Sequence, residues 1–295
     1  MLSAVEEAAP AASLAAPRRS GIIDLLVDSW GARISALWLS ALVLAAVLAP
    51  VLPLPSYEEG DLIAMLSPPS IEHWLGTDSL GRDILVRSIW GGRVSLLVAA
   101  GSVSIGLLIG GTLGLIAGYF GGRTDALVMG SMTVMLSFPA LILAIAIVSS
   151  LGPDLRNVVL AIGVLFVPAF ARIARANTLV FREREFVLAA VALGARLPRI
   201  LVREILPNLM PSLLSYGLLM VAVAILAEAA LGFLGLSVRP PLPSWGGMIG
   251  SERGNLSEAP HAVFLPALVM FVTTLAVNVL GERGRRLFDI KTQAL

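Results

Sequence analysis

The sequence contains no cysteine and a single lysine, and these two scarcities exclude several chemistries at once. Without cysteine there is neither a disulfide framework nor a thiolate site. The lysine, Lys291, follows Ile290 rather than a glycine, which excludes a phosphate-binding loop of the pattern GxxxxGK[ST]. The chain therefore does not hydrolyse ATP by that route.

Charged residues are also scarce, at 14% of the 295 residues, whereas 57% are hydrophobic. This balance is too apolar for a soluble domain of that length, so we predict an all-α, polytopic membrane protein. Six apolar segments approach or exceed the length that crosses a bilayer, at residues 34–54, 94–119, 126–151, 157–174, 211–236 and 262–281. The third segment carries Pro139, where we expect a kink.

These spans divide the chain into four parts. Residues 1–32 form an N-terminal tail whose last part, 22–30, is either a helix lying in the membrane interface or an extension of the first span. Residues 33–91 hold the first span and an external loop, residues 92–284 the membrane core, and residues 285–295 a C-terminal tail. With both termini inside, 15 of the 21 Lys and Arg residues lie on the inner side, as the positive-inside rule favours.

The segment Arg182–Asn208, between the fourth and fifth spans, carries an apolar run at 187–193 that is too short to cross a bilayer. The run must therefore bury itself against protein. Gly194 is a natural end for a first short helix, and Pro198 suits the first turn of a second. Pro207 disfavours helix at the residue before it. Five arginines surround the run: Arg182, Arg184, Arg196, Arg199 and Arg203.

A smooth, small-residue helix with a charged rim fits a groove on a partner. The segment resembles the cytoplasmic EAA loop of ABC importer permeases, the coupling element that docks into the ATP-hydrolysing subunit. The resemblance implies a coupling surface formed by Glu185, Ala189, Ala190, Gly194, Ala195, Arg203, Pro207 and Asn208.

Two further stretches are similar to the dipeptide, oligopeptide and nickel branch of these permeases. They are HWLGTDSLGRDILVRSIWGGRVSL, from His73 to Leu96, and ILAEAALGFLGL, from Ile225 to Leu236. The resemblance implies a type I permease in the inner membrane of a prokaryote, with no catalytic residue and no cofactor of its own. It also implies a second permease, two ABC ATPase subunits and an extracytoplasmic substrate-binding protein as partners.

The spans themselves carry two features of interest. Gly106, Gly110, Gly114 and Gly118 recur at intervals of four, a spacing that lets helix backbones approach closely, so we predict a packing face. Glu228 lies inside the fifth span and should face the bundle or a wet cavity. We favour a packing or gating role for it over substrate contact.

Other readings of the sequence remain open at this stage. His73 is a lone imidazole near acidic residues, which is more typical of a hydrogen bond within a loop than of a metal site. An ion-coupled secondary transporter needs coupling carboxylates in mid-membrane, and Glu228 alone is available. A non-transporting membrane scaffold is also compatible with the composition. The sequence does not distinguish peptides from nickel or another solute as substrate.

Overall fold

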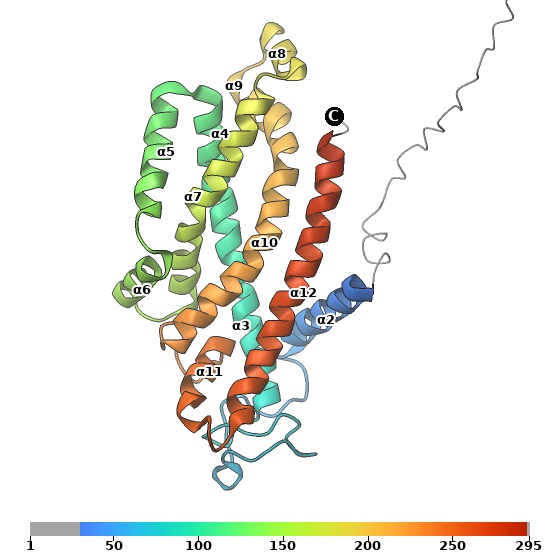
Figure 1. Ribbon diagram of the computed structural model, residues 1–295, viewed down its shortest axis with the longest axis vertical. Helices are drawn as coiled ribbons and strands as arrows, with labels where there is room; N and C mark the ends of the chain where they lie inside the picture. The colour runs from blue at the N-terminus through green and yellow to red at the C-terminus, as the bar shows by residue number, and fades with distance from the viewer. Residues whose placement is uncertain (1–29, 294–295) are drawn as a thin grey trace, which may run out of the picture.

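The computed structural model describes residues 30–293, which fold into helices with no β-strand among them. The segment 22–30, expected to form an interfacial or extended helix, lies outside the described residues except for Trp30, where helix α2 begins. The remainder is a bundle of long helices with one short helix, α8, projecting at one end and a loop-rich region at the other (Figure 1).

Five helices in this part of the chain are long and apolar enough to cross a membrane. They are α2 (Trp30–Leu48), α3 with η2 and α4 (Ile84–Ile105, Gly106–Gly110, Gly111–Phe120), α7 (Leu155–Phe181), α9 with η3 and α10 (Leu197–Arg199, Ile200–Ile205, Leu206–Phe233), and α12 (Pro260–Gln293). A sixth span is possible from the bent pair α5 (Gly122–Leu136) and α6 (Ala140–Leu151). The predicted all-α fold with six spans is therefore confirmed.

The third span is broken rather than kinked. Helices α5 and α6 meet at 87°, a much sharper turn than the kink expected at Pro139. Pro139 has no N–H to donate, and it disfavours helical geometry at Phe138 before it. The chain therefore leaves the helix at Ser137 and restarts at Ala140.

Helix α7 is the centre of the bundle. It lies between the α5–α6 pair and α10 in Figure 1, and it also packs along α3, η2 and α4. Its buried side includes Ile162, Phe166, Phe170 and Ala174, which belong to the main hydrophobic core. Figure 1 shows α12 beside α10, and α2 packs against α12.

The four spaced glycines all face α7. A side chain added at Gly106 would place its Cβ 2.7 Å from the Cβ of Phe166, and one added at Gly118 would lie 2.8 Å from that of Thr178. At Gly110 and Gly114 the nearest obstacles are backbone carbonyls of α7, which cannot rotate away. The first two glycines bound the π-helical segment η2. Backbone contact thus fixes how α3, η2 and α4 lie against α7.

The end of the bundle opposite α8 contains a helix that lies outside the predicted spans. Residues 237–261 separate the spans predicted at 211–236 and 262–281, and α11 (Trp245–Glu252) folds back into the bundle there. Its Trp245 is fully buried against Gly91 and Gly92 of α3, and the indole Nε1 donates to the Ser88 carbonyl at 2.9 Å. The two glycines, which have no side chain, allow this close packing.

Helix α3 also begins earlier than predicted, at Ile84 rather than near residue 94. The Asp83 side chain caps it, accepting a hydrogen bond from the Val86 N–H at 3.0 Å. The other carboxylate oxygen of Asp83 lies 2.9 Å from Nδ1 of His73. His73 is therefore a hydrogen-bonding residue of the loop, and no group of three metal-ligating side chains forms within residues 30–293.

Replacing Gly114 with Leu should destabilise the protein, because the added side chain must displace the α7 backbone. Overpacking of this kind costs roughly 1–3 kcal/mol or more. Thermal unfolding of the purified protein in detergent measures the effect. Gly31→Leu is the control, since no described atom lies within 4 Å of a Cβ at Gly31. Equal unfolding temperatures for Gly114→Leu and the unmodified protein would contradict the packing role.

Candidate functional site

Helix α8 (Glu185–Ala192) projects beyond the long helices at the end of the bundle opposite α11 (Figure 1). Of its apolar side chains, Val187 is buried on the bundle with 1% of its surface exposed. Leu188 and Val191 are exposed, and Leu193 just after the helix is 88% exposed. Among residues 187–193, only Val187 is buried within this chain, so the expected burial of the apolar run is incomplete and an apolar surface is exposed.

The turn after α8 depends on Gly194. Its φ of +74° lies in the left-handed region, which a residue with a Cβ rarely adopts. The Gly194 N–H donates to the Val191 carbonyl at 2.9 Å, and the next N–H, of Ala195, donates to Ala190 at 3.0 Å. No described atom lies within 4 Å of a Cβ at this position, so the requirement for glycine is conformational.

The second half of the segment differs from the expectation that Pro207 disfavours helix at the residue before it, since Leu206 is helical. A single helix of 37 residues runs from Leu197 to Phe233, through both Pro207 and Pro211. The π-helical segment η3 precedes Pro207, and the widened turn accommodates a proline ring without a break. The side chain of Asn208 donates to the Glu204 carbonyl at 2.7 Å and so satisfies one of the backbone acceptors in this turn.

The two halves enclose a groove of about 720 Å³. Four of the eight residues predicted for the coupling surface line it: Ala189, Ala190, Gly194 and Ala195. The other four lie elsewhere, with Glu185 at the start of α8 and Arg203, Pro207 and Asn208 on the long helix. Phe186, Arg199 and Glu204 also line the groove. Phe186 and Glu204 were not among the residues predicted for the coupling surface, because the fold of the segment, rather than sequence spacing, places them there.

Polar contacts hold the base of this projection. Arg182, at the end of α7, donates from Nη1 to the Gly118 carbonyl at 3.0 Å. About two helical turns earlier, Arg175 forms a two-point ion pair with Asp125 of α5. These bonds join the ends of α4, α5 and α7 that lie near α8 and give α8 a fixed starting point.

Glu228 is fully buried in α10. Its Oε2 accepts a hydrogen bond from the Ser95 hydroxyl of α3 at 2.7 Å, and its Oε1 accepts one from the Ser237 hydroxyl at 2.5 Å. No ion pair to Glu228 forms within the described residues. The carboxyl group therefore ties together three segments: α3, α10 and the chain that follows α10.

The architecture is similar to that of a solved transporter. One chain of the MetNI methionine ABC transporter, in an inward-facing conformation, superposes with a TM-score of 0.56 at 18% sequence identity. The match covers 69% of this chain and 95% of the other. At that identity the likeness establishes the fold.

Sequence comparison gives closer relatives. The chain is 41% identical to the dipeptide transport system permease protein DppC of Alkalihalophilus pseudofirmus over 256 residues, which are 87% of this chain and 84% of that protein. It is 42% identical to the glutathione transport system permease protein GsiD of Pectobacterium atrosepticum over 226 residues, or 77% and 75% of the two chains. GsiD of an Escherichia coli strain is 40% identical over 258 residues, 87% and 85% of the chains.

Residues 110–293 match the family of binding-protein-dependent transport system inner membrane components. That region includes the exposed α8 projection, the buried Glu228 and helix α11. The chain belongs to this family, and it is a multi-pass, non-catalytic ABC transporter permease of the dipeptide, oligopeptide and nickel branch.

Proposed function

We propose that this chain forms half of the translocation pathway of an ATP-driven importer of small peptides. The observation that carries the proposal is the exposed α8 groove at one end of a helix that runs, uninterrupted, to the other end of the bundle. The relatives named for dipeptides and glutathione, which is itself a short peptide, support the substrate class.

The partners follow from the surfaces that the chain leaves uncovered. An ATPase subunit docks on the α8 groove, where exposed Leu188, Val191 and Leu193 supply apolar contact and Arg196 and Arg199 a basic rim. A second permease of the same family completes the pathway, a second ATPase subunit serves that permease, and an extracytoplasmic substrate-binding protein delivers the peptide. The residues proposed for coupling are those predicted from the sequence, from Glu185 to Asn208.

Both termini lie in the cytoplasm in this proposal. The arginines of the coupling segment and the end of α7 then all face the cytoplasm, together with most of the other basic residues. The loop-rich end with α11 faces outward. We assign the membrane core to residues 92–284 and the first span with the external loop to 33–91, although α3 begins at Ile84, before that boundary.

Coupling would pass through the long helix that contains η3 and α10. Because the turn at Gly194 joins α8 directly to this helix, a displacement of α8 by the ATPase moves a rigid element that carries Glu228 near its far end. The glycine contacts hold α7 against α3 and α4 while this happens. A secondary transporter is less well supported, since Glu228 bonds to two serine hydroxyls within the protein.

Deleting the gene for this chain should abolish ATP-dependent uptake of radiolabelled dialanine by the parent strain. Expression of the chain from a plasmid should restore it. The same cells tested with nickel serve as the comparison. Restored nickel uptake without dialanine uptake would overturn the peptide assignment, and no effect on either solute would support the scaffold reading instead.

Gly194→Val should reduce ATPase-subunit association and peptide uptake by about tenfold or more. A β-branched residue at positive φ costs on the order of 1–3 kcal/mol, which distorts the turn joining α8 to the long helix. Co-purification of the ATPase subunits and dialanine uptake are the measurements. Gly130→Val is the control, because Gly130 lies in α5, has no positive φ and has no described atom within 4 Å of a Cβ. Normal association and uptake in Gly194→Val would remove the coupling assignment.

Glu228→Gln should change uptake only mildly, by less than about threefold, because the amide keeps the shape of the side chain and can bond to one or both serines. The effect should be equal for dialanine and for the cationic peptide alanyl-lysine. A loss confined to alanyl-lysine would show that Glu228 attracts cationic substrate along the pathway. Glu228→Ala, which leaves Ser95 and Ser237 unpaired, should instead destabilise the fold by about 1–3 kcal/mol.

A further inference from the structure

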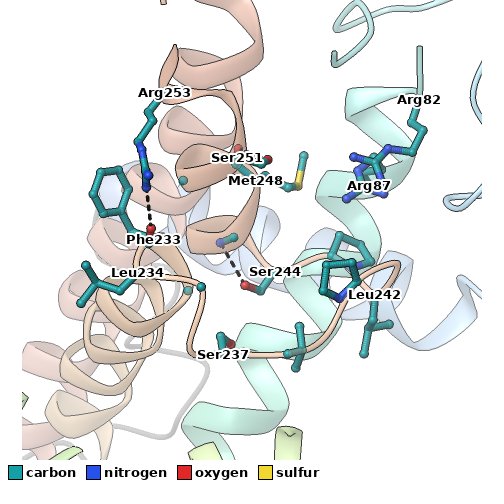
Figure 2. A pocket seen from close by; sticks show the side chains of 17 residues that line it. Arg82, Arg87, Phe233, Leu234, Ser237, Leu242, Ser244, Met248, Ser251 and Arg253 are labelled. Carbon is teal, nitrogen blue, oxygen red and sulfur yellow. Dashed lines mark hydrogen bonds between the residues drawn. The ribbon is translucent and has the colours of Figure 1, made fainter. Parts of the chain in front are cut away.

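The outer end of the molecule contains a cavity of about 370 Å³ that the coupling proposal does not use. It lies between the end of α10, the chain that follows it and one face of α11, at the opposite end of the bundle from α8 (Figure 1). Figure 2 shows Arg253 on one side of this cavity and Arg82 and Arg87 on the other.

The charges around the cavity are of one sign. Its charged lining residues are the three arginines, and no acidic residue is among the described residues that line it. Arg82 and Arg87 share one carboxylate, with the Oδ2 of Asp78 at 2.8 Å from the Nε of Arg82 and 3.4 Å from that of Arg87. The neighbouring acid, Glu252, is buried and already accepts from Ser79 and Asn255.

The guanidinium groups keep unused donors. Arg87 is 95% buried, yet among the described residues its bonds are those from Nη1 to the carbonyls of Tyr57 and Pro241, and its Nη2 has none. Arg82 donates through Nε alone. Arg253 makes a long contact of 3.4 Å from Nη1 to the Phe233 carbonyl and is otherwise exposed. A buried arginine with free N–H groups is costly unless an acceptor arrives to meet them.

A purely structural role explains part of this arrangement. Because the Nε of Arg87 is buried without a hydrogen-bond partner, 3.4 Å from Asp78, the brace that Asp78 gives the outer loop accounts for the Nε of Arg82 alone. It does not account for the free Nη groups of either residue, nor for Arg253, which has no carboxylate partner among the residues described. The three arginines that line the cavity therefore have more N–H donors than the described residues have acceptors for them.

The rest of the cavity wall is mixed in character. The hydroxyls of Ser237, Ser244 and Ser251 offer neutral hydrogen bonds, whereas Leu234 and Leu242 offer apolar surface. This combination suits an anion attached to a small organic body better than a bare inorganic ion. Planar guanidinium groups match a carboxylate in particular, because two N–H groups can meet two oxygens.

We propose that this cavity binds the terminal carboxylate of a small peptide on the extracytoplasmic side, before the peptide enters the membrane. Arg253 and the free N–H groups of Arg82 and Arg87 donate to the carboxylate oxygens. The apolar surface of Leu234 and Leu242 contacts the side chain of the peptide's C-terminal residue. The inference rests on the proposed function in peptide import, and it adds a substrate contact in this chain that Glu228 does not provide.

The test measures peptide binding to the assembled transporter, with both permeases and the ATPases in lipid nanodiscs and without the extracytoplasmic protein. The probes are radiolabelled dialanine and dialanine amide, compared by equilibrium dialysis. Arg253→Gln is the chosen variant because Arg82 and Arg87 also hold the loop through Asp78. It should weaken dialanine binding about tenfold, the effect of losing a charged hydrogen bond, while binding of the amide stays unchanged.

Arg156→Gln is the matched control, since Arg156 is exposed near the same end of the bundle and does not line the cavity. Arg253→Lys, which keeps the charge, should recover part of the dialanine affinity. Equal binding of acid and amide, no dialanine binding at all, or no effect of Arg253→Gln would each overturn the proposal.

Two further results would separate this inference from the proposed function. If Arg253→Gln weakens docking of the extracytoplasmic protein in the absence of peptide, the cavity receives an acidic side chain of that protein, and the peptide proposal is wrong. If cells take up dialanine but the purified complex shows no carboxylate selectivity, this inference fails and the import function stands. Absence of dialanine uptake by cells would instead remove the import function.

Discussion

The arrangement of the other helices depends on the close contact between the backbone of the α3–η2–α4 helix and that of α7. Along α3, η2 and α4 the glycine face meets α7, and at Gly110 and Gly114 the neighbours are carbonyl groups rather than side chains. In a membrane, where water does not drive apolar helices together, contact of this kind supplies packing energy that bulkier residues cannot. The position of α7 then fixes α8, because Arg182 at its end bonds back to α4.

One continuous helix joins the two ends of the molecule. The helix from Leu197 to Phe233 begins at the exposed groove, contains Glu228, and ends at the wall of the arginine-lined cavity. Ser237, which donates to Glu228, also lines that cavity. A buried carboxyl group that bonds to two segments holds the helix end in place, because leaving its hydroxyl partners unpaired would be costly. This geometry connects the proposed docking surface to the proposed substrate contact without a flexible joint inside the span.

Several features of the fold followed from the sequence because they depend on composition and length. An apolar segment of sufficient length must form a helix in a bilayer, so the six spans and their order were predictable. Pro139 marked the correct place for a bend, although its angle is set by how α6 packs across α7. Gly194 marked the turn after α8. Glycine adopts the left-handed backbone conformation of this turn because of its own local sterics, without any contact to a distant residue.

The sequence by itself determined the class of protein, the number of spans and the location of the exposed segment around α8, because each depends on local composition. Tertiary structure alone decided that Pro207 lies within a helix, that α11 folds into the bundle, and that Arg82, Arg87 and Arg253 surround one cavity. These outcomes depend on contacts between residues far apart in the chain: a widened turn absorbs the proline, and Trp245 packs on glycines some 150 positions away. Such contacts leave no periodic signal in the sequence.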